Sequence, residues 1–505
     1  MNLRLASLEK HEKTDAVAIP VFEKEIQDHP AFRKAEKSLA ALILKTAASE
    51  DFSAKRDQVW VFHTHQKLGT DRLLLLGLGP RATYEPEHLR MASGSAARSL
   101  SKLRDTSVLF DLRALPDSSA SVRGVVEGIL LGDYRYDRFR SARSADEETP
   151  HLRDVLLLTS EPDAAKLKPI IRLSTKIAEA TNWARDLVNE PAATLTPTRL
   201  AEHAQELAEQ AGLEISVGDR ERIAELKMGL FLGVAKGSSE EPRLIHLAYI
   251  PRDPEHAKER PLALVGKAIT FDSGGLSLKT TEGMLDMKSD MAGAAAVLGA
   301  MRVIALLRPP FPVRAFMGAC ENMPSGTAYR LGDVLTSRLG KTVEVTNTDA
   351  EGRLVLGDML AWANEHNPSE IIDLATLTGA CVVALGHYIA GAFGQDEPMI
   401  KSLLAAGASA GERFWQMPIT ELQRDALKSE IADLKNAGDR WGAAISAALF
   451  LKEFVGDTPW VHLDIAGPSM SPKERGYFSK GATGMGVRTL VEYVRRRSLE
   501  STISA

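Results

Sequence analysis

A chain of 505 residues is too long for one ordinary hydrophobic core, so its length predicts two domains. Hydrophobic residues make up 44% of it and charged residues 26%, values typical of globular proteins, which argues against disorder over most of the length. The net charge of -5 excludes a strong overall attraction to nucleic acids or anionic membranes, but it does not exclude a local basic patch.

Cysteine usage and hydropathy bear on the compartment. Only two cysteines occur, Cys320 and Cys381, which argues against a disulfide scaffold and fits a reducing environment. The first residues lack the continuous apolar segment of a signal peptide, and the most apolar internal runs are short or interrupted. We therefore expect a cytoplasmic protein without a membrane partner.

The first part of the chain alternates strand-like and helix-like segments. Strands are predicted over residues 57–64, 72–79, 106–112 and 153–160, and helices over 89–103 and 122–136. This alternation predicts an α/β domain with a largely parallel sheet over residues 1–160. A helical segment at 161–188 should link it to the rest, with Pro169 as a candidate break.

The second part, residues 189–505, alternates in the same way and should form a larger α/β domain. Its predicted strands are 243–250, 261–271, 312–320, 342–348, 370–377 and 460–467, with helices between them.

Two glycine patterns imitate known motifs and are rejected. Residues 77–82 match a loose dinucleotide fingerprint, but Pro80 and Pro86 delay the next helix to about Glu87, so we expect a strand-ending turn. Residues 407–411 match a hydrolase nucleophile pattern but follow a helical segment instead of a strand. Histidines form no H-E-x-x-H motif, and the closest pair, His63 and His65, is best explained as structural or exposed.

Charged residues recur beside glycines in three very apolar parts of the second domain. Lys267 and Asp272 flank one predicted strand end, followed by Gly274-Gly275 and Lys279. Asp286 and Asp290 precede an alanine-rich helix that must be buried. Singly, each has an ordinary explanation as a helix cap, a turn residue or a solvated charge.

The third such segment is residues 343–360, in which Asp349, Glu351 and Arg353 occupy alternate positions. An extended backbone would point all three into one crevice at the carboxyl ends of the strands. Several carboxylates crowded there would repel one another unless cations bound between them, which predicts a divalent-metal site. A carboxylate-rich set suits two ions about 3.5–4 Å apart. Spacing alone leaves both Asp286 and Asp290 as candidates.

These segments resemble the cytosolic leucyl aminopeptidase family of two-metal exopeptidases. The resemblance rests on GKAITFDSGGLSLK, MKSDMAGAAAV and the highly specific NTDAEGRLVL, and on RDLVNEPAATLTP, NMPSGTAYRLGDV, DLATLTGACVVALG, HLDIAG and GATGMGVR in the family's order. It implies a central mixed sheet flanked by helices in the catalytic domain. It also implies a homohexamer and release of N-terminal leucine and other mainly apolar residues from peptides.

The resemblance also assigns roles to individual residues. The implied ligands of two Mn or Zn ions are Lys267, Asp272, Asp290, Asp349 and Glu351, with Asp272 and Glu351 shared, and Asp286 drops out. Lys279 and Arg353 would be catalytic, with bicarbonate held at Arg353. The pocket for the first side chain would be lined by Met287, Thr376, Gly379 and Ala466.

Small departures and one alternative complete the prediction. Ala268 and Leu331 replace the family's usual Gly and Pro, and Ser469 stands where some relatives carry Met, which leaves the preferred side chain open. As a ligand, Lys267 must be a neutral amine, so we expect its pKa to fall well below about 10.4.

The alternative function is a DNA-binding accessory protein. The arginines at 495–497 allow it, but a solvated surface charge is the better explanation of these arginines.

Overall fold

The computed structural model describes residues 1–6, 13–34, 37–141, 150–161 and 164–504. The chain forms two compact units. The first comprises Met1–Asn182 and Lys473–Lys480, and the second comprises Trp183–Pro472 and Gly481–Ala505.

The first unit is an α/β domain, as predicted, with a six-stranded sheet in the order β1-β6-β5-β2-β4-β3. All of its strand pairs are parallel except the pair of β3 and β4. The strands are β1 (Asn2–Leu5), β2 (Ala16–Val21), β3 (Val59–His63), β4 (Arg72–Gly77), β5 (Ser107–Asp111) and β6 (Asp154–Leu158). The helices are α1 (Pro30–Lys34), α2 (Lys37–Ser49), α3 (Pro86–Lys102), α4 (Ser118–Gly132) and the start of α5 (Ala164–Asn189).

The sequence did not predict strands β1 and β2 or helices α1 and α2, and two further details differ from expectation. Pro169 lies inside α5 near its start, where it removes one backbone donor, and the helix continues past it. Residues 473–480 return from far along the chain to pack here. The Tyr477 hydroxyl donates to Glu87 Oε1 at 2.9 Å, and its ring packs with Met91 and Leu131.

The second unit contains the mixed sheet that the family resemblance implied, in the order β15-β14-β17-β13-β9-β10-β8-β7. Its four central strands, β17, β13, β9 and β10, are parallel to one another, whereas β8 and β14 run antiparallel at their flanks. The strands are β7 (Glu214–Gly218), β8 (Arg243–Tyr249), β9 (Leu262–Asp272), β10 (Val313–Asn322), β13 (Glu370–Ala375), β14 (Ala390–Gly394), β15 (Phe414–Gln416) and β17 (Trp460–Asp464). Small sheets are formed by β11 (Val334–Thr336), β12 (Thr342–Glu344) and β16 (Leu434–Lys435), and by β18 (Met470–Ser471) and β19 (Gly481–Ala482).

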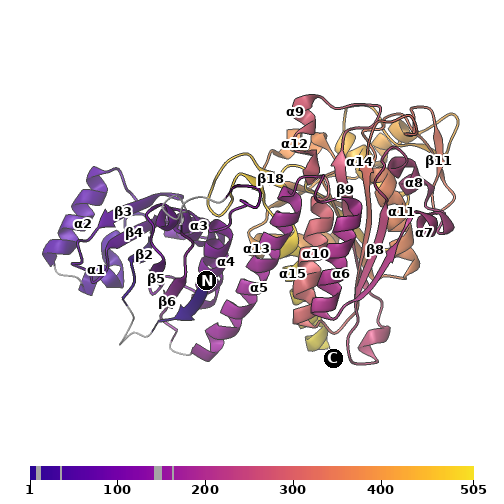
Figure 1. Cartoon of the computed structure of the whole chain (residues 1–505). Coiled ribbons are helices and arrows are strands. Elements are labelled where there is room, and N and C mark those ends of the chain that lie inside the picture. The colour runs from indigo at the N-terminus through magenta and orange to yellow at the C-terminus, as the bar shows by residue number, and fades with distance from the viewer. Residues whose placement is uncertain (7–12, 35–36, 142–149, 162–163, 505) are drawn as a thin grey trace. The chain divides into compact units, whose positions relative to one another are not determined.

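Helices cover both faces of this sheet (Figure 1). On β9, Gly266 faces α10 whereas its neighbour Val265 belongs to the core around α11, so these two helices lie on opposite faces. The helices of the second unit are α6 (Pro197–Ala211), α7 (Arg220–Glu225), α8 (Gly229–Ala235), α9 (Thr281–Met284), α10 (Ala292–Leu307), α11 (Gly352–Glu365), α12 (Gly379–Leu385), α13 (Glu397–Ala410), α14 (Ala443–Lys452) and α15 (Val487–Ser504).

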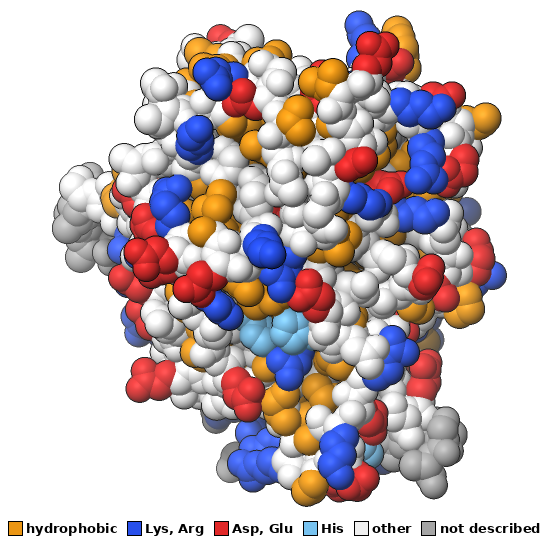
Figure 2. All heavy atoms as spheres, turned by 90° about the vertical axis from the view of Figure 1, so that its right-hand side faces the viewer, with side chains coloured by type: hydrophobic (Ala, Val, Ile, Leu, Met, Phe, Trp, Pro, Cys, Tyr) orange, Lys and Arg blue, Asp and Glu red, His pale blue; other side chains and the backbone are white. Residues whose placement is uncertain are grey.

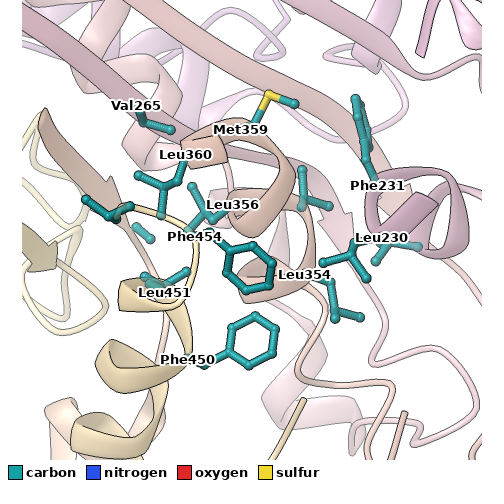
Figure 3. Close-up of a cluster of buried hydrophobic side chains, with 14 of the residues drawn as sticks. Leu230, Phe231, Val265, Leu354, Leu356, Met359, Leu360, Phe450, Leu451 and Phe454 are labelled. Atoms are coloured by element: carbon teal, nitrogen blue, oxygen red, sulfur yellow. The ribbon is translucent and has the colours of Figure 1, made fainter. Parts of the chain in front are cut away.

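A dense apolar core fixes α11. Figure 3 shows Leu354, Leu356 and Leu360 of this helix among Leu230 and Phe231 of α8 and Phe450 of α14. All of these side chains are fully buried. Because the first turn of α11 carries Arg353 and follows Glu351 directly, this core holds both charged residues in place.

The backbone does not stay extended through residues 349–353, which was the condition for alternation to place these side chains on one side. Strand β12 ends at Glu344, and Glu351 already has helical dihedral angles (φ -75°, ψ -39°) as the residue before α11. Alternation along a strand therefore does not bring Asp349, Glu351 and Arg353 together. The chain turns between strand and helix, because apolar residues from Leu354 onward recur at helical spacing and pack into the core.

Helix α10 is a core helix. Among the described residues, the helical segment 281–307 is long and apolar enough to cross a membrane. However, 78% of its most apolar stretch is buried inside the structure, as in the core helix of a globular protein. Its first turn lies directly on the sheet backbone. A Cβ atom on Gly293 would lie 2.1 Å from the Leu374 carbonyl oxygen and 2.9 Å from the backbone nitrogen of Lys267.

We therefore expect Gly293→Ala to destabilise the second unit by about 1–3 kcal/mol, the usual cost of overpacking a core. The measurement is the urea midpoint of unfolding. The control is Gly326→Ala, since among the described residues no heavy atom outside the adjacent chain residues lies within 4 Å of a Cβ atom at that position. Equal midpoints for the two variants would contradict this packing.

Candidate metal centre

The carboxyl ends of the four central parallel strands meet at one edge of the large sheet, the position at which open α/β sheets bind ligands. Asp272 ends β9 and is paired in register with Asn322, which ends β10. Asp464 ends β17, and Thr376 directly follows β13. The sheet topology thus gathers polar residues from four chain segments.

Three buried carboxylates lie close together at this edge. One oxygen each from Asp272, Asp290 and Glu351 lies within 4.8 Å of the others. Asp290 comes from the turn that precedes α10, and Glu351 from the residue that precedes α11. Asp286 is exposed, and of the two aspartates that spacing left open only Asp290 belongs to this group among the described residues.

Two lysines divide the acidic residues into two pairs. Lys267 Nζ lies 2.8 Å from Asp290 Oδ2 and 2.9 Å from Glu351 Oε1. Lys279 Nζ lies 2.8 Å from Asp272 Oδ2 and 2.5 Å from Asp349 Oδ1. Asp349 is more accessible than the other three carboxylates, with 34% of its side chain exposed. All five expected metal ligands are therefore within one charged network.

The loop after β9 is shaped by two glycines with positive φ. Gly274 (φ 86°) and Gly275 (φ 63°) adopt a backbone that other residues rarely take, which turns the chain against residues 347–349. There the Thr348 hydroxyl donates to the Gly274 carbonyl at 2.6 Å and accepts from Ser277 N at 2.7 Å. This contact brings Lys279 and Asp349 to the same place.

Burial and charge move the pKa values of the network in opposite directions. Burial, assisted by Glu351, raises the pKa of Asp272 to about 6 against the lowering effect of the lysines. Burial also raises the pKa of Asp290 well above its usual range. Glu351 differs, because Lys267 and Lys279 outweigh the effect of burial and lower its pKa.

The expected fall in the pKa of Lys267 is not found for the groups that the structure contains. Burial lowers this pKa, but Asp290 and Glu351 outweigh it and raise the pKa above its ordinary value. The expectation rested on neighbouring metal cations. Their positive charge would disfavour the ammonium form of Lys267 and lower its pKa, whereas the carboxylates raise it.

Several buried oxygens at this edge lack a hydrogen-bond donor. Among the described residues, Glu351 Oε2 and Asn322 Oδ1 have no hydrogen-bond partner, and Asp290 Oδ2 lies near Lys267 without hydrogen-bonding geometry. Leaving such atoms unsatisfied is costly, and a divalent cation would satisfy them. Clustered carboxylate oxygens are the ligands that such cations take, so the residues present fit a metal site.

Arg353 provides a buried positive charge beside the carboxylates. Its Nη1 donates to the Asn436 carbonyl at 2.9 Å, and its Nε has no hydrogen-bond partner in the described segments. Within the described part of the chain, no carboxylate oxygen lies within 4.0 Å of the guanidinium. Burial lowers its pKa to about 10, against the raising effect of Glu351 and Asp464, so it remains charged at neutral pH. This geometry can accept a small anion.

The four expected pocket residues lie on three segments around the network. Thr376 is bound to it directly, since its hydroxyl donates to Asp290 Oδ1 at 2.8 Å and its carbonyl accepts from Lys267 Nζ at 2.9 Å. Met287 is half-buried and lies three residues before Asp290, and Gly379 is the exposed first residue of α12. Ala466 lies two residues beyond β17, and its nitrogen donates to Asp464 Oδ1 at 3.2 Å.

Sequence reasoning missed Asn322 and Asp464. Asn322 Nδ2 donates to Asp272 Oδ1 at 2.8 Å and to the Thr348 carbonyl at 2.9 Å, which orients the aspartate. The sequence did contain a sign of both residues, because each is a polar residue at the end of an apolar strand. The two rejected glycine motifs behave as expected: residues 77–79 end β4, and residues 407–411 form the end of α13.

Comparisons with known proteins agree with this architecture. The chain matches the model of the catalytic domain of the cytosol aminopeptidase family over residues 182–491 and that of its N-terminal domain over residues 18–143. A probable cytosol aminopeptidase from Geobacter sp. (strain M21) is 43% identical over 96% of this chain and 97% of its own length.

Two solved structures are similar over almost the whole chain. The bottromycin maturation enzyme BotP in complex with Mn is 36% identical, with a TM-score of 0.84, over 96% of this chain and 100% of that one. A mutant of tomato leucine aminopeptidase is 34% identical, with a TM-score of 0.88, over 98% of this chain and 96% of that one.

The two-domain α/β fold and its buried carboxylate cluster thus define a metal-dependent aminopeptidase, a hydrolase that acts on peptides. The chain belongs to the cytosol aminopeptidase family.

The alternative of a DNA-binding accessory protein is not favoured. The three arginines that suggested it are engaged with carboxylates: Arg495 and Arg496 pair with Glu492, and Arg497 pairs with Glu370. On the face of the molecule drawn in Figure 2, basic side chains are interspersed with acidic ones. DNA binding usually requires a basic stripe along one face, and these paired arginines do not supply it.

Close packing of Gly352 against Lys267 gives a direct test of the network. A Cβ atom on Gly352 would lie 2.3 Å from Cε and 2.6 Å from Nζ of Lys267, which is buried and has little room to move. We expect Gly352→Ala to weaken binding of added Mn²⁺ about 10–100-fold, as displaced supporting groups do in metal sites. Titration calorimetry after chelation measures it, and binding as tight as in Gly326→Ala would contradict the arrangement.

Proposed function

We propose that the enzyme binds two divalent ions, Mn or Zn, at the carboxyl edge and releases N-terminal leucine and other mainly apolar residues from peptides. Catalysis is assigned to residues 189–505, from which residues 473–480 leave to pack in the first unit, with residues 1–160 as a separate domain and 161–188 as the linking helix. The observation that carries the proposal is the buried group of Asp272, Asp290 and Glu351 with a lysine on either side. A relative whose structure is described as a complex with Mn supports the choice of metal.

The proposed ligands are Lys267, Asp272, Asp290, Asp349 and Glu351, with Asp272 and Glu351 shared between the ions. The division by the two lysines supports two subsites. Lys279 joins Asp272 to Asp349, and Lys267 joins Asp290 to Glu351. When bound, two such ions polarise the scissile carbonyl, activate a water molecule and hold the substrate's free amine.

The two lysines have different roles in this proposal. Lys267 acts as a ligand and must lose its proton to do so, because an ammonium group has no free electron pair. Lys279 remains charged and stabilises the oxyanion that develops on the substrate carbonyl. Its pKa supports this, since Asp272 and Asp349 outweigh the effect of burial and raise it above its ordinary value.

Arg353 is proposed to hold a bicarbonate ion that helps to remove a proton from the attacking water. A buried guanidinium with an unpartnered Nε supports this role. Such a site favours a small planar anion that can accept two parallel hydrogen bonds.

Met287, Thr376, Gly379 and Ala466 are proposed to line the pocket for the first side chain. Their small or apolar side chains suit an apolar residue. The nearby Ser469 is buried, and its hydroxyl donates to the Ala466 carbonyl at 3.2 Å, so it supports the backbone at this end of the pocket.

We also propose a cytoplasmic homohexamer, in line with the resemblance and with the naming of the relatives as cytosol aminopeptidases. Light scattering is expected to give a mass of six chains, and a stable monomer at micromolar concentration would refute the assembly.

The lysine roles predict different losses. Lys267→Ala should bind less metal and lose activity, because it removes a ligand. Lys279→Ala should retain both ions and lose rate, because it removes a contact made mainly in the transition state. Metal analysis beside steady-state kinetics measures both quantities. Equal metal loss in the two variants would refute this division.

The exopeptidase geometry predicts a strict need for a free amine. An N-acetylated leucyl peptide should react slower than the free peptide by orders of magnitude, because acetylation removes the basic nitrogen and adds bulk where the chain should end. The assay uses the chelated enzyme resupplied with Mn, Zn, Co or Mg at pH about 8–9, where the α-amino group is largely neutral. Comparable rates for the two peptides would exclude an aminopeptidase.

A further inference from the structure

Asp464 is a fully buried carboxylate at the catalytic edge that is not among the proposed metal ligands. It ends β17, and 0% of the residue is exposed. Oδ1 accepts from Leu377 N at 3.3 Å and from Ala466 N at 3.2 Å, and Oδ2 accepts from the Thr378 hydroxyl at 2.7 Å. One side chain therefore joins two loops, at residues 376–378 and at residue 466.

These two loops carry two of the four proposed pocket residues, Thr376 and Ala466. Thr376 on the first loop is bonded to Asp290 and Lys267. Thr378 also accepts from Cys381 N at 3.1 Å and so begins α12, whose first residue is Gly379. The second loop follows β17 and contains Ala466. Backbone pairing of β13 with β17 already joins the two segments up to Ala375 and Ile465, and Asp464 extends this connection to residues 377, 378 and 466 beyond the strand ends.

A carboxylate suits this position better than an amide. Three donors converge on its two oxygens, and an asparagine would turn its NH₂ group toward at least one of them. Inside a protein, an unsatisfied donor of this kind is costly, so the loops would move apart. The negative charge also acts on Arg353, whose pKa it helps to raise against burial.

Asp373 provides a contrast on the adjacent strand β13. It is equally buried, but its partners are Trp460 Nε1 and His462 Nδ1, each at 2.6 Å. Both partners lie on β17 within the sheet. Asp373 therefore stabilises the sheet and has no bond to either pocket loop in the described residues.

We propose that Asp464 is a positioning residue for first-residue specificity, which locks the loop at 376–378 to Ala466. The proposal rests on the proposed function, because the pocket is assigned there. It adds that the discrimination between large and small first residues depends on a carboxylate that does not itself touch the substrate.

The test compares hydrolysis of leucyl and glycyl p-nitroanilides by the full-length, metal-loaded enzyme. In Asp464→Asn and Thr378→Val, the ratio of kcat/KM for the leucyl over the glycyl substrate should fall about tenfold, the size of a lost side-chain contact in an apolar pocket. Thr378→Ser keeps the hydroxyl and should restore the ratio. Trp460→Phe removes a buried bond to Asp373 and should leave the ratio unchanged. Metal content is measured for every variant.

The outcomes distinguish failure of the positioning role of Asp464 from failure of the proposed aminopeptidase function. An equal loss of kcat/KM for both substrates would show that Asp464 acts only on overall structure and would overturn the proposal, with the aminopeptidase function intact. An unchanged ratio in Thr378→Val would overturn it as well, even if Asp464→Asn fails to fold. A wild-type enzyme that hydrolyses neither substrate would remove the proposed function, and the positioning role with it.

Discussion

Buried like charges cannot remain together without compensation, and the catalytic edge of this protein gathers three buried carboxylates within 4.8 Å. Lys267 and Lys279 supply the compensation that the structure contains, each between two acidic residues. The donorless oxygens that remain, Glu351 Oε2 among them, are what makes the edge suitable for divalent ions. The surrounding fold can be understood as the means of holding these charges in place.

Two kinds of packing hold them. On one face of the sheet, α10 lies directly on the backbone, because glycine at 266 and 293 removes the side chains that would separate helix and strand. That contact sets Asp290, just before α10, beside Lys267. On the other face, the apolar core around Leu354 and Leu360 fixes α11 and with it Glu351 and Arg353. Parallel strand order then brings Asp272 and Asn322 to the same edge.

Much of this could be predicted from the sequence, because local patterns carry it. The continuous apolar runs gave β9, β10 and β13, and charged residues beside glycines marked the edge where ligands bind. Spacing could not separate Asp286 from Asp290, since either can precede a helix, and only the packing of α10 shows which is buried. The extended backbone on which the alternation of Asp349, Glu351 and Arg353 depended is not present at Glu351, because the apolar face of α11 outweighs local alternation. The return of residues 473–480 to the first unit and the bonds of Asp464 depend on contacts far apart in sequence, which no local pattern reveals.

The central claim is that this network of lysines and carboxylates binds two divalent ions. Anomalous diffraction from crystals of the wild-type enzyme soaked in Mn²⁺ tests it most directly. The account predicts two strong peaks about 3.5–4 Å apart, the usual separation in two-metal sites, surrounded by Asp272, Asp290, Asp349 and Glu351. A single peak, or peaks away from these carboxylates, would contradict it.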